Sequence, residues 1–189
     1  MTSFSQSDLG RKLSSAVLHS VALALSSLLT FWLVTHLLTN IYSASHSDDL
    51  LGGMWAVVAT LFVYRYSYQQ SLSAAIQRMA ATMVSFVLCF VYLSLSVFHP
   101  WGLALLIGVG TLIMMLIGHL DDVVTTAITT AVVMVVAALS PHNAWEQPVL
   151  RLLDTVVGVA IGLAGAWLGL RVAPALRGRS GDVHVDPAP

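Results

Sequence analysis

The sequence predicts an all-α membrane protein with six transmembrane helices, arranged as two inverted repeats of three helices each. Three observations lead to this fold class: the composition, six long apolar stretches, and one residue pattern shared by two of them. The chain has 189 residues, of which 57% are apolar and 9% charged, whereas soluble domains carry about 25% charged residues. Its net charge of -1 argues against a nucleic-acid partner, which would require a clustered basic surface.

Six apolar stretches are long enough to cross a bilayer, because a hydrocarbon core of about 30 Å requires roughly 20 helical residues. They are Val17–Leu38, Leu50–Tyr66, Met79–Phe98, Trp101–Gly118, Val123–Leu139 and Val149–Leu170. We therefore expect residues 17–172 to form one membrane domain embedded in the lipid bilayer. Residues 1–16 would be a cytoplasmic N-terminal segment, and the polar, Gly- and Pro-containing tail 173–189 would be disordered.

The basic residues predict the orientation, because cytoplasmic flanks of membrane helices are enriched in Lys and Arg. With the N terminus inside, one basic residue, Arg151, falls outside. The others fall on the cytoplasmic side: Arg11, Lys12, Arg65, Arg78, Arg171, Arg177 and Arg179. Both termini are then cytoplasmic, and Arg151 is the basic residue that topology does not explain.

The third and sixth expected helices share one pattern. Alternating steps of four and three residues from Arg151 reach Thr155 and then a stripe of glycines suited to close helix packing: Gly158, Gly162, Gly165 and Gly169. The same steps from Arg78 reach Thr82, Ser85 and Cys89, at a constant offset of 73 residues. Because three helices is an odd number, the two halves would be inverted, as in many secondary transporters.

Arg151 and Asp154 lie three residues apart on one helical face and can form an ion pair. A charge near the bilayer centre costs roughly 2.5 to 3.5 kcal/mol on insertion scales, so such residues are usually functional or paired. Two structural explanations stay open. The arginines can snorkel to lipid headgroups, or Arg151 and Asp154 can form a pair that only stabilises the fold.

Residues 54–85, MWAVVATLFVYRYSYQQSLSAAIQRMAATMVS, resemble the second and third helices of the fusaric acid resistance and aromatic acid exporter superfamily. The residues that match its motifs are Trp55, Ala56, Ser71, Leu72, Ala75, Arg78 and Thr82. Ser85 stands where a glycine is usual. RLLDTVVG, residues 151–158, resembles the R-x-x-D-T-x-x-G motif that opens the last helix of that superfamily. The resemblance covers about residues 10–172.

This resemblance implies a transporter of organic anions such as aromatic carboxylates, related to the aluminium-activated malate transporters. It implies two six-helix units around one pathway, so we expect a homodimer or a partner subunit. We expect efflux across the bacterial inner membrane, no enzymatic activity, and no cofactor or metal.

A guanidinium is a permanently charged, bidentate partner for a carboxylate. We therefore expect Arg78 and Arg151 to form an electropositive constriction, with hydroxyls from Thr82 and Thr155 and an aromatic wall from Trp55. Asp154 would hold Arg151 in position or exchange protons.

Two alternatives belong to other classes of protein. The chain could be a membrane scaffold that docks a partner through its glycine stripe without transporting anything. It could also be an intramembrane enzyme in which His119, Asp121 and Asp122 bind a metal or act as acid and base, although polar residues are expected in a tight turn.

Tyr64 and Tyr66 are typical of the aromatic belt at the membrane surface, and His19 is typical of a histidine at the membrane interface.

Overall fold

The structure is a computed structural model that describes residues 6–38, 46–139 and 144–179, with side chains over 13–36, 49–139 and 144–171. Every regular element in these ranges is helical, which confirms the all-α fold class. The elements are α1 (Gln6–Leu33), the π-helical η1 (Val34–Leu38), α3 (His46–Val63), α4 (Tyr68–Leu95), α5 (Pro100–Ile117), the 3-10 turn η2 (Leu120–Asp122), α6 (Val123–Leu139) and α7 (Glu146–Arg179).

Five segments within the described residues are long and apolar enough to cross a membrane. They are Leu13–His36, Tyr68–Leu95, Pro100–Ile117, Leu120–Leu139 and Glu146–Arg171. The sixth expected span corresponds to α3, whose apolar part, Asp49–Val63, is shorter. The 18 residues of α3 measure about 27 Å along the helix axis. The prediction of six crossings therefore depends on α3.

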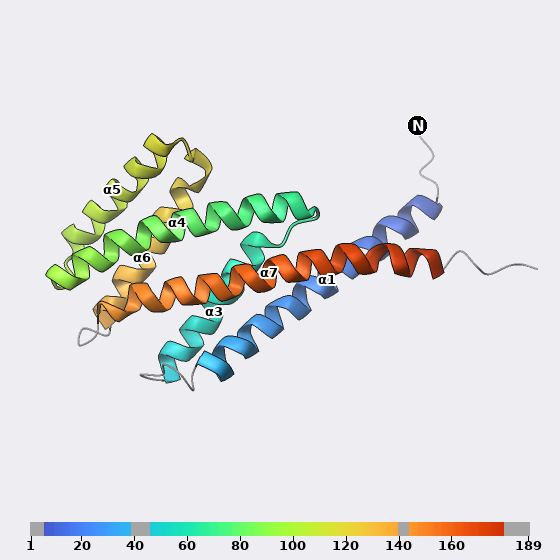
Figure 1. The fold of residues 1–189 in the computed structure, drawn as a ribbon, viewed down its shortest axis with the longest axis horizontal. Helices are drawn as coiled ribbons and strands as arrows, with labels where there is room; N and C mark the ends of the chain where they lie inside the picture. The colour runs from blue at the N-terminus through green and yellow to red at the C-terminus, as the bar shows by residue number, and fades with distance from the viewer. Residues whose placement is uncertain (1–5, 39–45, 140–143, 180–189) are drawn as a thin grey trace, which may run out of the picture.

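The helices pack around α7 and α4, which run side by side (Figure 1). α1 and α3 pack against each other and against α7. On the other side of the bundle, α5 and α6 form a hairpin that packs against α4. This arrangement brings α3, α4, α6 and α7 together in the middle of the molecule.

Small and medium-sized apolar residues fill the two parts of the core. One cluster joins α3, α4 and α7 through Ala59, Val63, Ala75 and Val159. The other joins α4, α5 and α6 through Cys89, Leu93, Leu106, Val133, Met134 and Ala137. Many larger apolar side chains are exposed instead, among them Leu25 and Leu28 of α1. Such outward apolar surfaces are what a protein surrounded by lipid presents.

Among the described residues, hydroxyl groups connect neighbouring helices around Thr60 and around Ser85. On the α3 side, Thr60 Oγ1 donates to the carbonyl oxygen of Gly158 in α7 at 3.0 Å. On the α6 side, Thr130 Oγ1 donates to Ser85 Oγ in α4 at 3.1 Å, and Ser85 Oγ donates to the carbonyl oxygen of Thr126 at 3.1 Å. In a bilayer these bonds hold helices together, because no water competes for the donors.

The glycines of α7 are contact points for α3 and α1. A Cβ at Gly158 would run into the backbone carbonyl of Ala56, and one at Gly165 into the hydroxyl of Ser26. A Cβ at Gly162 would lie 3.1 Å from the carbonyl oxygen of Thr60. At Gly169 it would lie 3.0 Å from the Tyr64 hydroxyl. The glycine stripe therefore lets the neighbouring helices approach the α7 backbone.

Several helix boundaries differ from those expected. α4 begins at Tyr68 rather than near Met79, so Arg78 lies inside the helix rather than at its head. The glutamines before Arg78 lower the local hydropathy, but they do not interrupt helical hydrogen bonding. α7 runs from Glu146 to Arg179, and thus continues into the segment 173–189 that was expected to be disordered. α1 begins at Gln6, so most of the expected N-terminal segment 1–16 is also helical. Residues 1–5 and 180–189 lie outside the described residues.

Candidate functional site

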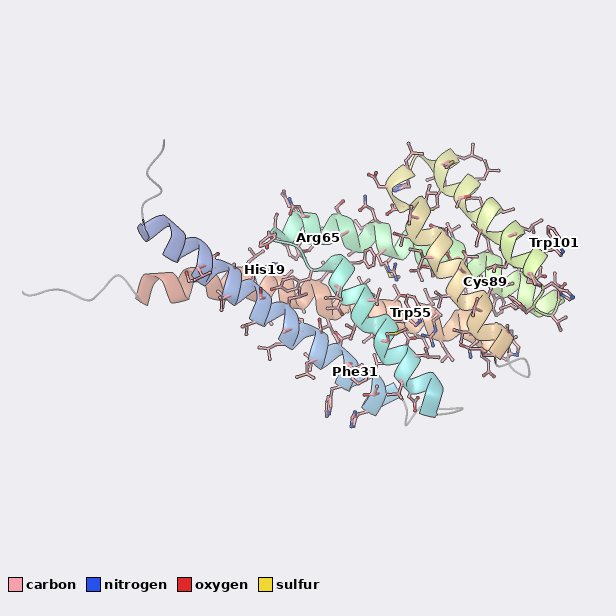
Figure 2. The ribbon with its side chains drawn as sticks, turned by 180° about the vertical axis from the view of Figure 1, so that it is seen from behind. His19, Phe31, Trp55, Arg65, Cys89 and Trp101 are labelled. Atoms are coloured by element: carbon pink, nitrogen blue, oxygen red, sulfur yellow. The ribbon has the colours of Figure 1, made fainter. Side chains whose placement is uncertain are left out.

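Arg78 and Arg151 line one small cavity in the middle of the bundle. The cavity has a volume of about 10 Å³, which is enough for about one water molecule. Its walls come from α3, α4, α6 and α7, through Trp55, Arg78, Thr129, Val132, Val133, Arg151 and Thr155. The structure thus brings together four of the five residues that the sequence predicts to bind substrate. Figure 2 shows Trp55 on α3, between the two ends of the bundle.

The two arginines are buried on the inner faces of their helices. Arg78 is 5% exposed and Arg151 is 4% exposed. On α4, the buried face that carries Arg78 also carries Ser71, Ala75 and Thr82. These small residues leave room for α7 to lie close to α4, so the long side chain of Arg78 is covered by neighbouring helices. Neither arginine side chain snorkels to the surface in this structure.

Arg151 and Asp154 form an ion pair within α7. The distance from Arg151 Nη1 to Asp154 Oδ2 is 3.1 Å, and both side chains are buried. The hydroxyl of Thr155 donates to the Arg151 carbonyl oxygen at 2.8 Å, so this threonine satisfies its donor on its own helix. A Cβ at Gly52 of α3 would lie 3.0 Å from Asp154 Oδ1. Gly52 therefore leaves the space that the carboxylate occupies.

Arg78 has different surroundings. Its guanidinium carbon lies 4.9 Å from the centre of the Phe62 ring, a cation–π contact. Within the described part of the chain, no ion pair joins Arg78 to a carboxylate, and its Nε has no hydrogen-bond partner. Because Asp154 balances the charge of Arg151, the two arginines and the aspartate together carry one net positive charge.

Two further buried donors near Arg78 have no hydrogen-bond partner in the described residues: Trp55 Nε1 and Thr82 Oγ1. Trp55 lines the cavity, whereas Thr82 lies one turn beyond Arg78 and is outside its lining. Buried polar groups are nearly always hydrogen-bonded in native proteins. Trp55 Nε1 and Arg78 Nε are therefore two unsatisfied donors on residues that line the cavity, where an acceptor molecule would satisfy them.

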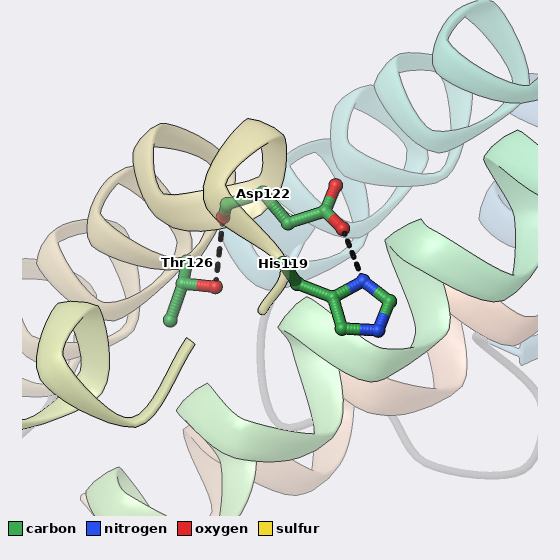
Figure 3. Close-up of polar contacts among 3 residues, drawn as sticks. All are labelled: His119, Asp122 and Thr126. Atoms are coloured by element: carbon green, nitrogen blue, oxygen red, sulfur yellow. Dashed lines mark hydrogen bonds and ion pairs between the residues drawn. The ribbon is translucent and has the colours of Figure 1, made fainter. Parts of the chain in front are cut away.

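His119 and Asp122 contact each other in the turn between α5 and α6 (Figure 3). His119 Nδ1 lies 3.3 Å from Asp122 Oδ2, and Thr126 Oγ1 donates to the Asp122 carbonyl oxygen at 3.0 Å. Gly118, with φ of 88°, supplies the left-handed backbone conformation that ends α5. The residues that the structure describes contain no group of three or more His, Cys, Asp or Glu side chains placed to hold a metal ion.

Some residues of the site were not predicted from the sequence, among them Val132 and Val133 of the cavity lining. Gly52 lies against Asp154, the Phe62 ring contacts Arg78, and Thr129 lines the cavity. The adjacent glycines at 52 and 53 are the signal that could have indicated a close helix approach. Phe62 and Thr129 carry no such signal, because their role depends on which helices meet.

The fold and the buried arginine cavity define the class of protein: a multi-pass helical membrane protein with a positively charged interior. The family of fusaric acid resistance protein-like proteins matches residues 32–165, well over half of the chain. The chain therefore belongs to this family. Its members are transporters rather than enzymes. No curated protein and no solved structure matches the chain. The matched region contains every residue that lines the cavity.

Proposed function

We propose that this protein is an efflux transporter of organic anions, such as aromatic carboxylates, and that Arg78 and Arg151 lie on the transport pathway. One observation carries the proposal: Arg78 is buried beside a second arginine and forms no ion pair with a described carboxylate. A substrate carboxylate would supply the direct ion-pair partner that Arg78 lacks among the described residues. Guanidinium–carboxylate pairs are among the strongest hydrogen-bonded contacts in proteins.

The donors around Arg78 also suit a carboxylate. A carboxylate accepts several hydrogen bonds and donates none. The indole N–H of Trp55, the hydroxyl of Thr82 and Nε of Arg78 are buried donors without partners in the described residues. Asp154 is already engaged with Arg151 at 3.1 Å, so in this proposal it orients Arg151 rather than binding substrate.

The cavity volume indicates a closed conformation. Pockets for small ligands typically measure about 300–1,000 Å³, whereas this cavity measures about 10 Å³. An aromatic carboxylate can enter only if α3, α4, α6 and α7 move apart. In our proposal this structure is an occluded state, and transport requires at least one more open state.

Two features support the proposed inverted repeat. α1 packs on α3 and α7, and the corresponding α5 packs on α6 and α4. The hydroxyl of Thr60 bonds Gly158, and that of Thr130 bonds Ser85, where Gly158 and Ser85 hold equivalent positions at the offset of 73 residues. In transporters with inverted repeats, substrate binds where the two halves meet. Arg78 and Arg151 would lie at that boundary. We further propose that the chain acts as a homodimer in a bacterial inner membrane.

Flux through the purified protein tests the proposal. Vesicles containing the wild-type chain should take up labelled 4-hydroxybenzoate faster than empty vesicles, and runs with and without a pH gradient would show whether protons are coupled. Arg78→Gln should lower the rate about tenfold or more, because hydrogen bonds to charged groups are worth about 1.5–3 kcal/mol. Arg171→Gln is the matched control, since Arg171 is exposed and packs on Trp167. If the wild-type protein transports no organic anion, the proposal is wrong. That result would favour the alternative that the chain is a membrane scaffold that docks a partner protein.

A further inference from the structure

Arg65 borders two cavities at the end of the bundle where α3 and α4 meet. The outer cavity, about 310 Å³, lies between α1, the turn from α3 to α4, and α7, and its lining includes His19, Tyr64, Arg65 and Tyr66. The middle cavity, about 200 Å³, is lined by Arg65 and also by Arg78. Arg78 in turn lines the inner cavity with Arg151. Each cavity therefore shares an arginine with the next.

The outer cavity is lined by aromatic rings and by the exposed guanidinium of Arg65. The ring of His19 stacks on Tyr66, with centroids 4.0 Å apart and planes at 12°. It also lies 4.8 Å from the Tyr64 ring. Tyr66 is 75% exposed, so much of its ring is open to a ligand. Arg65 is exposed as well, and it forms no ion pair among the described residues. Figure 2 shows His19 and Arg65 near the same end of the bundle.

Two backbone hydrogen bonds attach the turn that carries Arg65 to the helices on either side. The backbone N–H of Arg65 donates to Ser71 Oγ at 3.0 Å, and Ser71 is fully buried in α4. The N–H of Tyr64 donates to the Thr60 carbonyl oxygen at 2.9 Å, which extends the hydrogen bonding of α3. The turn is thus attached to both helices, which holds the backbone of Arg65 where its side chain borders both cavities.

We infer that the outer cavity is a capture site for an aromatic carboxylate, which binds Arg65 through its carboxylate and the rings of Tyr66 and His19 through its own ring. This inference rests on the proposed transport function and adds a second, peripheral binding site to it. From there the anion reaches Arg78 through the middle cavity. Arginine and aromatic side chains are the groups that recognise a flat, negatively charged molecule.

The middle cavity is suited to passage rather than tight binding. Its lining includes Asp121 and Asp122 as well as Arg65 and Arg78, so the formal charges of these four residues balance. Asp122 also contacts His119 at 3.3 Å. An anion would be attracted by the arginines and repelled by the aspartates. Conduction requires sites that release a ligand as well as bind it.

The phosphate of an anionic lipid shares the charge of a carboxylate and could reach the same arginine. The rings favour the aromatic carboxylate, because a lipid phosphate gains nothing from stacking. Vesicles made only of phosphatidylcholine contain no anionic headgroup, and vesicles with added phosphatidylglycerol do. Running every assay in both separates the two ligands.

The test measures uptake of labelled 4-hydroxybenzoate at several concentrations. In phosphatidylcholine vesicles, Arg65→Gln should raise KM about tenfold and leave the maximal rate within about twofold, because capture precedes the step at Arg78. Tyr66→Leu should raise KM severalfold, whereas Tyr66→Phe should keep the wild-type KM. Arg171→Gln is the control, because Arg171 is exposed near the same end and lines none of the three cavities.

Calorimetric titration of 4-hydroxybenzoate into the purified protein separates this inference from the proposed function. Binding that depends on Arg65 without any flux would support the capture site and reject transport. Flux with an unchanged KM in Arg65→Gln would reject the capture site and leave transport standing. The inference is also overturned if Arg65→Gln and Arg171→Gln change KM equally, or if the effect of Arg65→Gln appears only with phosphatidylglycerol. If Arg65→Gln does not fold, its loss of binding is uninformative, and Tyr66→Leu becomes the deciding variant because it leaves every charge in place. Weaker binding by folded Tyr66→Leu would then support the capture site, and wild-type binding would reject it.

Discussion

Arg78 and Arg151 begin the same residue pattern on two helices, but their charges are balanced differently. Arg151 lies 3.1 Å from the Asp154 carboxylate. Arg78 contacts the ring of Phe62 and forms no ion pair in the described part of the chain. An isolated buried cation is costly, because desolvation is not compensated. A substrate anion would provide that compensation at Arg78 but would compete with Asp154 at Arg151.

Replacing Asp154 with Asn should destabilise the protein, because it leaves the buried guanidinium of Arg151 without its carboxylate. Breaking such a pair costs about 3–5 kcal/mol in other proteins. The measurement is thermal unfolding in detergent, followed by circular dichroism. The double variant Arg151→Gln/Asp154→Asn should lose less stability than Asp154→Asn alone. Equal melting of Asp154→Asn and the wild type would show that the pair contributes nothing.

Part of the cavity lining could be predicted from residue spacing together with the family resemblance. The positions of Arg78, Arg151 and Thr155 on their helical faces predicted that the three side chains face the interior of the bundle, and all three line the cavity. Thr82 was expected beside them but lies outside the lining, although Thr155, at the same spacing from Arg151, lies within it. Arg65 was assigned only to topology. Its place between two cavities depends on α1 and α7, which no local pattern reveals.

At the scale of elements, α7 is the helix that organises the bundle, and its glycines allow close contact. Hydropathy predicted the apolar centre of each helix well, because burial in lipid requires it. It predicted the ends of α4 and α7 poorly, because helices continue into polar segments wherever backbone hydrogen bonds can form. Hence Arg78 lies inside α4 rather than at its beginning.

A methyl group at Gly158 should destabilise the bundle, since it would collide with the backbone carbonyl of Ala56. Overpacking of this kind costs about 1–3 kcal/mol. Gly108→Ala is the matched control, because nothing lies within 4 Å of a Cβ at Gly108. Alanine there should be neutral or stabilise the helix by up to about 1 kcal/mol. Thermal unfolding of both variants checks the prediction, and identical melting curves would contradict it.

At the scale of the whole molecule, six crossings place the turn at Arg65 and the turn at Asp121 on the same side of the membrane. Both residues line the middle cavity, which agrees with the crossings of α4 and α5 between them. The crossing of α3 is a separate question. Five helices have spans of sufficient length, whereas the apolar part of α3 is shorter. A short helix can cross if the bilayer thins locally. Sequence alone could not decide this point, since the apolar part of α3 is short for a membrane span.

Cysteine labelling tests that topology. Cys89 is the single cysteine, so Cys89→Ala gives a background without thiols. In it, Tyr66→Cys and Asp121→Cys should react with a membrane-impermeant maleimide from the same side of intact cells, and His99→Cys from the opposite side. All three positions are exposed. Asp49→Cys, near the start of α3, should react from the same side as His99→Cys. Labelling of Asp49→Cys and Tyr66→Cys from the same side would mean that α3 does not cross the membrane.

The most direct test of the central claim is the initial rate of 4-hydroxybenzoate flux in vesicles containing Arg78 variants at equal protein density. Arg78→Lys keeps the charge but loses the bidentate geometry, and Arg78→Gln keeps much of the length but loses the charge. We predict the highest rate for the wild type, a lower rate for Arg78→Lys, and a rate near that of empty vesicles for Arg78→Gln. A folded Arg78→Gln variant that transports at the wild-type rate would contradict the claim that substrate passes Arg78.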